Sequence, residues 1–303
     1  MTPALPPPEP PEVALHAFVR AGAELALAPG EPASSAAALE MARLKVAVST
    51  SHLGATLQLE AADTPRLLDA VAHIRPVPWL TVRAGQFKTP VSADFLVPAP
   101  RMRTPTRAWI VQAVPRRELG ISARAAVADV ATVELGVFDP VSALDVSGPG
   151  VRPVLAANVE LPGHVAVHAA ATTWIRPAET DLAAEHRPGW DHVVDGAVAW
   201  HPPHSELSVE GLLAHRVDGD GLDGGITALA AHTFPLGTLG IEVAGAWDTA
   251  SFHRELAHRL TAAVNLHVDG WRLVARASWE ASFSADLRSP TEAVGRLQLQ
   301  AGF

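Results

Sequence analysis

Hydrophobic and polar residues alternate along much of this chain in steps of two. Between Val13 and Leu27 the odd positions are all apolar, whereas the even positions include His16, Arg20 and Glu24. Successive side chains of a β-strand point to opposite faces, so this pattern predicts a strand with one apolar and one polar face. The same alternation returns at intervals as far as the C-terminus.

Continuing in this way predicts sixteen strands, most of them about ten residues long. The predicted strands are 13–28, 39–50, 53–61, 67–75, 79–87, 117–127, 131–138, 151–161, 164–174, 190–200, 205–215, 225–234, 237–247, 257–268, 270–280 and 292–303.

The connections between these strands alternate between short and long. Those after even-numbered strands are short, such as Ser51-His52 and Asp269-Gly270, and those after odd-numbered strands are mostly longer, the longest being 88–116. Outer-membrane barrels have tight periplasmic turns and longer external loops, and tilted strands of about ten residues fit a bilayer. The sequence therefore predicts an all-β fold, a transmembrane antiparallel up-and-down β-barrel with an aqueous lumen.

Composition narrows the class further. The 303 residues are 48% hydrophobic and 18% charged, yet no long uncharged apolar run exists, which excludes a membrane protein built from helices. The absence of Cys excludes disulfide scaffolds and cysteine chemistry. A net charge of -9 argues against nucleic acid as a partner.

Tryptophans supply a further sign of a membrane barrel, because indoles gather at the headgroup level. Only Trp109 lies in a predicted loop. The tryptophans at or beside predicted strand ends are Trp79, Trp174, Trp190, Trp200, Trp247, Trp271 and Trp279. The alternative is the core of a soluble β-protein, which would fold without detergent. The terminal Phe303 resembles the signal that bacterial barrels present to their assembly machinery.

The chain divides into a short lead-in and one domain. Residues 1–12 are rich in proline and predict a disordered N-terminal lead-in, and 13–303 predict a single outer-membrane barrel domain. The expected location is the bacterial outer membrane, with membrane lipid and lipopolysaccharide as partners. Residues 1–11 hold no export signal, which points to a trimmed chain, a misplaced gene start or a chain that is never exported.

Several motifs resemble those of the phosphate-selective porin O and P family. The most specific is 85–90, Gly-Gln-Phe-Lys-Thr-Pro, and 115–120, 136–139, 264–266 and 296–299 fit more loosely. The resemblance spans about residue 40 to the end. It implies a sixteen-stranded outer-membrane pore, a homotrimer, whose third external loop folds into the lumen and narrows it. The chain departs from the family in lacking Tyr and in its short external loops, so its solute need not be phosphate.

The third loop is strongly basic in an otherwise acidic protein. Its cationic residues stand against only Asp94, and they are Lys88, Arg101, Arg103, Arg107, Arg116 and Arg117. Rings of Arg and Lys make a pore favour anions, so these residues are the candidate pore constriction and anion-binding site. The alternatives are that they bind lipopolysaccharide phosphates at the outer rim or are simply solvated.

The polar phase of the strands predicts the lumen wall. Arg83, Arg124, Arg272 and Arg276 fall in this phase and are candidate lumen-lining residues. Acidic and basic residues are balanced there, so the simplest interpretation is cross-strand ion pairs in a wet lumen.

Other chemistry is weakly indicated. His201 and His204 have no acidic or thiol partner at ligand spacing, and the Asp-Gly run 218–224 lacks the Glu of a calcium loop, so neither metal nor cofactor is expected. Ser205 has no nucleophile motif around it, and the chain is not expected to be an enzyme.

The sequence thus predicts a porin through which small anionic or neutral hydrophilic solutes diffuse. We expect the pore to prefer anions, and phosphate is one candidate solute. The alternative is a barrel plugged by 88–116 that has a structural or anchoring role. A barrel-embedded enzyme is disfavoured because no catalytic triad is evident.

Overall fold

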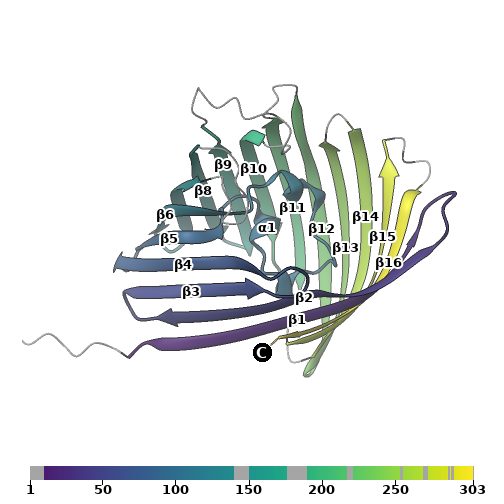
Figure 1. The fold of residues 1–303 in the computed structure, drawn as a ribbon, viewed down its shortest axis with the longest axis horizontal. Coiled ribbons are helices and arrows are strands. Elements are labelled where there is room, and N and C mark those ends of the chain that lie inside the picture. Colours follow the sequence, from purple (N-terminus) through teal and green to yellow (C-terminus); the bar gives the residue numbers. More distant parts are fainter. Residues whose placement is uncertain are drawn as a thin grey trace, which may run out of the picture.

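The computed structural model is a closed barrel of sixteen antiparallel strands (Figure 1). It describes residues 10–139, 150–175, 190–216, 221–252, 255–268, 272–285, 287 and 290–302. The strands are β1 (Glu12–Leu27), β2 (Ser34–Ser49), β3 (Leu53–Glu60), β4 (Arg66–Val77), β5 (Leu80–Lys88), β6 (Arg117–Val127), β7 (Ala131–Asp139), β8 (Arg152–Leu161), β9 (Val165–Thr173), β10 (Trp190–Trp200), β11 (Ser205–Arg216), β12 (Leu222–Leu236), β13 (Leu239–Phe252), β14 (Glu255–Val268), β15 (Leu273–Ser284) and β16 (Pro290–Gly302).

Each strand pairs with its neighbours in sequence, and the first and last strands close the ring. β1 pairs with β16 in a register that sets Val19 opposite Ala301 and Arg20 opposite Gln300. Closure removes every free strand edge, as a lipid environment requires. The predicted fold class and all sixteen predicted strands are confirmed.

Several strands are longer than predicted. β2 begins at Ser34 rather than 39, which shortens the first long connection, and β13 continues to Phe252 rather than 247. The added part of β2, Ser-Ser-Ala-Ala-Ala, contains only small residues, so it shows no hydrophobic alternation. The added part of β13, Asp-Thr-Ala-Ser-Phe, is mostly polar or small on both faces. Alternation marks only the part of a strand that separates an apolar from a polar environment.

The two faces of the wall differ as predicted. Val19 and Leu135 point outward and are 41% and 59% exposed, whereas the adjacent inward residues Arg20 and Glu134 are buried. Trp247 and Trp279 lie on the outer face five residues before the C-terminal ends of β13 and β15, further from those ends than predicted.

The connection between β5 and β6 turns into the barrel (Figure 1). It contains the short helix α1 (Ala93–Leu96) and two 3-10 turns, η1 (Ala99–Arg101) and η2 (Trp109–Ala113). The predicted inward folding of the third external loop, 88–116, is confirmed. No helix in the described residues is long and apolar enough to cross a membrane.

Some predicted features lie outside the described residues. They are the lead-in as far as residue 9, the loops 140–149 and 176–189, residues 217–220 of the Asp-Gly run, Trp271 and Phe303.

Candidate functional site: the loop folded into the lumen

The motif at 85–90 fixes the base of the loop. Gly85 has φ +130°, and a Cβ there would collide with the backbone of β4, so only glycine fits. The side-chain amide of Gln86 donates to the carbonyls of Leu67 and Leu68, each at 3.0 Å. The backbone N–H of Thr89 donates to the Arg116 carbonyl at 3.0 Å, which joins the two ends of the loop.

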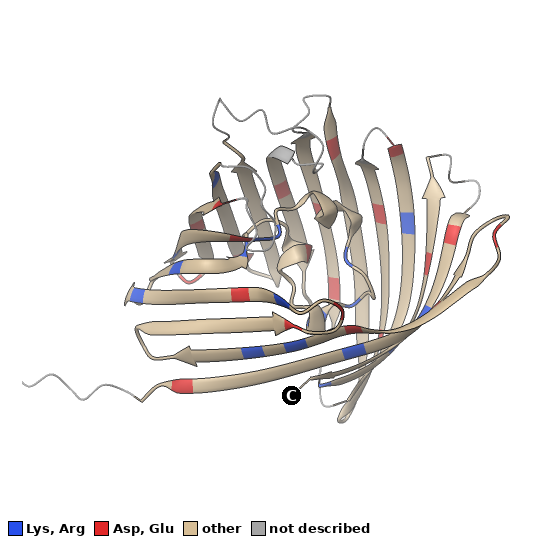
Figure 2. Ribbon diagram, viewed as in Figure 1, with Lys and Arg blue, Asp and Glu red and all other residues tan. Residues whose placement is uncertain are grey.

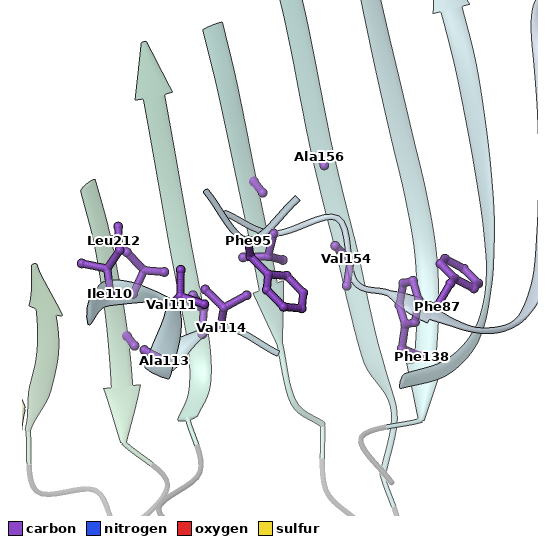
Figure 3. Close-up of a cluster of buried hydrophobic side chains, with 14 residues drawn as sticks. Phe87, Phe95, Ile110, Val111, Ala113, Val114, Phe138, Val154, Ala156 and Leu212 are labelled. Carbon is purple, nitrogen blue, oxygen red and sulfur yellow. The ribbon is translucent and has the colours of Figure 1, made fainter. Parts of the chain in front are cut away.

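Next, the loop buries an apolar face against the inner wall. Phe95 of α1 and Ile110 of η2 belong to a buried cluster that includes wall residues of β5, β7, β8, β9, β10 and β11 (Figure 3). The ring of Phe138 meets that of Phe87 edge to face, with centroids 5.2 Å apart. Leu212 lies beside Ile110 at the other end of the cluster (Figure 3). Burial of these groups holds the loop against one side of the lumen.

The rest of the loop is held through its own carbonyl groups. Arg20 on β1 donates to the carbonyl of Ala99 at 2.8 Å, and Gln300 on β16 donates to that of Pro100 at 2.9 Å. Asn265 on β14 donates to the Arg103 carbonyl at 2.9 Å. These contacts satisfy carbonyl groups in the irregular backbone of the loop.

Arg276 and Arg259 act in the same way. Arg276 on β15 donates to the carbonyls of Met102 and Thr104, and Arg259 on β14 donates to the Arg107 carbonyl at 2.7 Å. The loop therefore spans the lumen from β5 and β6, where it starts and ends, to β14, β15, β16 and β1.

Four of the six predicted loop cations have close partners within the protein. Lys88 donates to the carbonyl of Phe95 and, at 3.4 Å, to that of Val97. Arg107 donates to the Val97 carbonyl at 2.7 Å and lies 3.9 Å from the carboxylate of Asp94.

The other two of these four form ion pairs with the wall. Arg103 contacts Glu206 at 2.6 Å and also Glu242, and Arg117 contacts Asp69 at 2.8 Å. The Arg103 pairs hold the loop, whereas the Arg117 pair joins β6 to β4, and in both cases much of the charge is compensated locally.

The remaining two, Arg101 and Arg116, are exposed. Within the described residues, neither guanidinium forms a hydrogen bond or ion pair with the protein. The other four cations are more buried. For one of them, Arg107, burial lowers the pKa of the guanidinium, and burial also raises the pKa of its partner Asp94. The charge of each partner partly opposes the shift of the other.

The predicted lumen-lining residues take different positions. Arg83 pairs with Glu134 across β5, β6 and β7, and Arg276 holds the loop as described. Arg124 is exposed and lies 3.4 Å from the Thr132 hydroxyl. Arg272 is exposed in the turn that precedes β15, at the rim of the barrel.

Charges of the wall are separated around the barrel, although the sequence showed no overall bias. From β9 to β13 the described inward side chains include no Lys or Arg, but include the carboxylates Asp195, Glu206, Glu210, Glu242 and Asp248. Lys and Arg lie on the remaining part of the wall, for example on β1, β2, β5 and β14, where carboxylates such as Glu60 and Asp69 accompany them (Figure 2).

A cavity of about 240 Å³ lies between the loop and the acidic side of the wall. Its lining includes Arg101, Arg103 and Asp94 from the loop and residues of β8 to β14 from the wall. The wall residues Glu160 and Glu206 lie beside short turns, so the cavity reaches toward the short-turn end of the barrel.

Sequence reasoning missed the surface on which the loop packs. Phe138, Val154, Ala170, Val193 and Leu212 interrupt the polar phase of their strands with apolar residues. Apolar residues at lumen positions of five neighbouring strands were the available signal, because a water-filled lumen has no use for them.

Comparison with known proteins identifies the fold. No family model matches the chain, and no curated protein sequence matches it. Among solved structures, an anion-selective porin from Comamonas acidovorans superposes with a TM-score of 0.68 at 11% identity, covering 97% of this chain and 100% of that one. The outer membrane channel DcaP of Acinetobacter baumannii gives 0.65 at 12% identity, covering 97% of each chain.

A mutant of the Rh. blastica porin gives a TM-score of 0.58 at 14% identity and covers 96% of this chain and 100% of its own. These likenesses show that the chain has the fold of outer-membrane porins.

Proposed function

We propose that this protein is an outer-membrane diffusion channel for small hydrophilic solutes, with a modest preference for anions. The observation that carries the proposal is the cavity beside a loop that is bonded to both sides of a sixteen-stranded barrel. Such a loop narrows a wide lumen to molecular size while the loop itself stays fixed.

The anion preference is assigned to the exposed arginines of the loop. Of the six cations predicted to form the constriction, Lys88, Arg103, Arg107 and Arg117 are compensated by partners, which leaves Arg101 and Arg116 to act on passing ions. Phosphate is one candidate anion, since Arg can bind it through two parallel hydrogen bonds.

We further propose a homotrimer in the bacterial outer membrane. No described outward side chain of β1 to β8 is Phe or Trp, apart from Trp79 in a turn, whereas Trp200, Trp247 and Trp279 point outward from β10, β13 and β15. Aromatic girdles mark the surface that meets lipid headgroups, lipopolysaccharide included, so the aromatic-free side suits contact with other copies. A neighbour of the same fold, OmpT of Vibrio cholerae, is described in a trimer form.

Single-channel recording in a planar bilayer tests the proposal. We expect discrete conductance steps, a reversal potential in a KCl gradient that favours chloride, and a shift toward potassium in Arg101→Gln/Arg116→Gln. Arg124→Gln, an exposed arginine outside the loop, is the matched control. An unchanged reversal potential in the double variant would refute the anion assignment, and added phosphate would reduce the current if phosphate binds.

A plugged barrel with an anchoring role is the second candidate, favoured by the apolar cluster that fixes the loop. A folded barrel that stays electrically silent would support it. Catalysis is not proposed: Ser205 Oγ lies 2.7 Å from His232 Nδ1, but no carboxylate completes the pair among the described residues.

A further inference from the structure

The cavity beside the loop contains two exposed charges of opposite sign that have no partner within the described residues. Arg101 reaches the cavity from η1, and Glu160 reaches it from the C-terminal end of β8. The first belongs to the loop and the second to the wall, so they lie on opposite sides of the cavity.

Most other charged groups that line the cavity are already engaged. Arg103 pairs with Glu206, and Arg259 pairs with Asp248 at 2.6 Å. Glu210 accepts the backbone N–H of Asp94 at 2.7 Å. The exposed charges that a solute meets in the cavity, and that have no partner within the described residues, are therefore those of Arg101 and Glu160.

Between these charges the lining combines small apolar residues with neutral polar ones such as Ser208 and Thr227. Ala166, Ala197, Ala199 and Ala246 contribute only methyl groups to the wall of the cavity. A volume of about 240 Å³ lies below the roughly 300–1,000 Å³ of sites for drug-sized ligands. The space thus suits a short solute with a charged group at each end.

We propose that this cavity is a subsite for small zwitterions, which bind with the carboxylate at Arg101 and the ammonium group at Glu160. This inference rests on the proposed channel function and names a solute class for it. An anion would be attracted by Arg101 but repelled by the acidic wall of β9 to β13. A cation would be attracted by Glu160 but repelled by Arg101. A zwitterion satisfies both groups.

Swelling of proteoliposomes in isotonic solutes tests the inference. The zwitterion is 4-aminobutanoate, and the neutral comparison is erythritol, which has the same number of carbons. We expect 4-aminobutanoate to enter about two to five times faster than erythritol, which corresponds to about 0.4–1 kcal/mol and lies within the range of exposed ion pairs. Arg101→Gln and Glu160→Gln should each bring the ratio of the two rates close to one.

Matched controls separate this site from general surface charge. Arg75→Gln removes an exposed arginine of β4 and Glu292→Gln removes an exposed carboxylate of β16, and neither residue lines the cavity. Both should keep the wild-type ratio. The reversed pair Arg101→Glu/Glu160→Arg should recover part of it, since opposite charges again face the cavity.

The outcomes distinguish the two proposals. If erythritol enters but the ratio is one in every variant, the zwitterion subsite is refuted and the channel stands. If neither solute enters through a folded barrel, the channel itself is refuted, and the subsite with it.

Discussion

Arg103, near the tip of the inward loop, forms an ion pair with Glu242 on β13, a side chain with no exposed surface. The same guanidinium contacts Glu206 on β11 at 2.6 Å. Since the loop begins at β5 and ends at β6, one residue ties its tip to the opposite part of the wall. Asn265 strengthens the tie by donating to Glu242 Oε1 at 2.8 Å.

Removal of the Arg103 side chain should release the tip of the loop. Arg103→Ala leaves Glu242 buried with less compensation, at a cost of about 1.5–3 kcal/mol for hydrogen bonds to a charged group. We expect the open-channel current to fluctuate more and its mean to rise, which single-channel recording measures. Gln112→Ala, at an exposed position in the same loop, is the control. A steady current in Arg103→Ala would show that the hydrogen bonds from the wall to the carbonyl groups of the loop are enough to hold its tip.

Glycine at 225 makes room for the 3-10 turn η2. A Cβ on this residue of β12 would lie 2.8 Å from Ile110 Cγ2 and would also meet the backbone of β13. Gly225→Ala should therefore push η2 away from the wall, at roughly 1–3 kcal/mol for overpacking. We expect a lower midpoint of thermal unfolding in detergent, and gel mobility measures that midpoint. Gly295→Ala is matched, because a Cβ there meets nothing within 4 Å, and an equal shift in both variants would contradict the assignment.

Phe138 is one of two phenylalanines of the inner wall in the cluster that the loop covers, the other being Phe87. It is 1% exposed, and Gly120 and Gly136 on its two sides leave the space that its ring occupies. Phe138→Ala should lower the free energy of unfolding by about 3–5 kcal/mol, and Phe138→Leu should lower it by less. The same unfolding midpoint measures both effects. Leu135→Ala on the outer face provides the comparison, since that side chain is 59% exposed in the isolated chain. If the inner and outer substitutions cost the same, the cluster does not anchor the loop.

The sequence predicts the barrel because one rule, alternation, governs every strand. The bounds of β6 match the prediction, 117–127, because polar and apolar residues alternate clearly there. The rule fails at Ser34 in β2, where small residues hide the phase. The fate of the loop cations was not predictable in this way. Arg103 and Arg101 are two residues apart, yet only the first reaches carboxylates, and those lie more than a hundred residues away in sequence.

Asp94 offers a pH-dependent test of how the loop is held. Burial raises the pKa of its carboxyl, Arg107 opposes the shift, and Asp248 and Glu210 add negative charge nearby. A raised pKa means that the packed loop favours the neutral carboxyl. That stabilisation is therefore complete below the ordinary pKa of about 3.9 and is lost as the pH rises through the raised value.

We expect the loop to be held more firmly in acid, so that current fluctuations of the wild-type channel decrease as the pH falls from 8 to 4. Asp94→Asn cannot ionise but can still accept the Ala108 N–H, which lies 3.2 Å from the carboxylate, so its fluctuations should depend less on pH. Asp63→Asn, at an exposed position between β3 and β4, should retain the wild-type dependence. If Asp94→Asn keeps the full dependence, another group, with Glu210 the nearest, controls the loop.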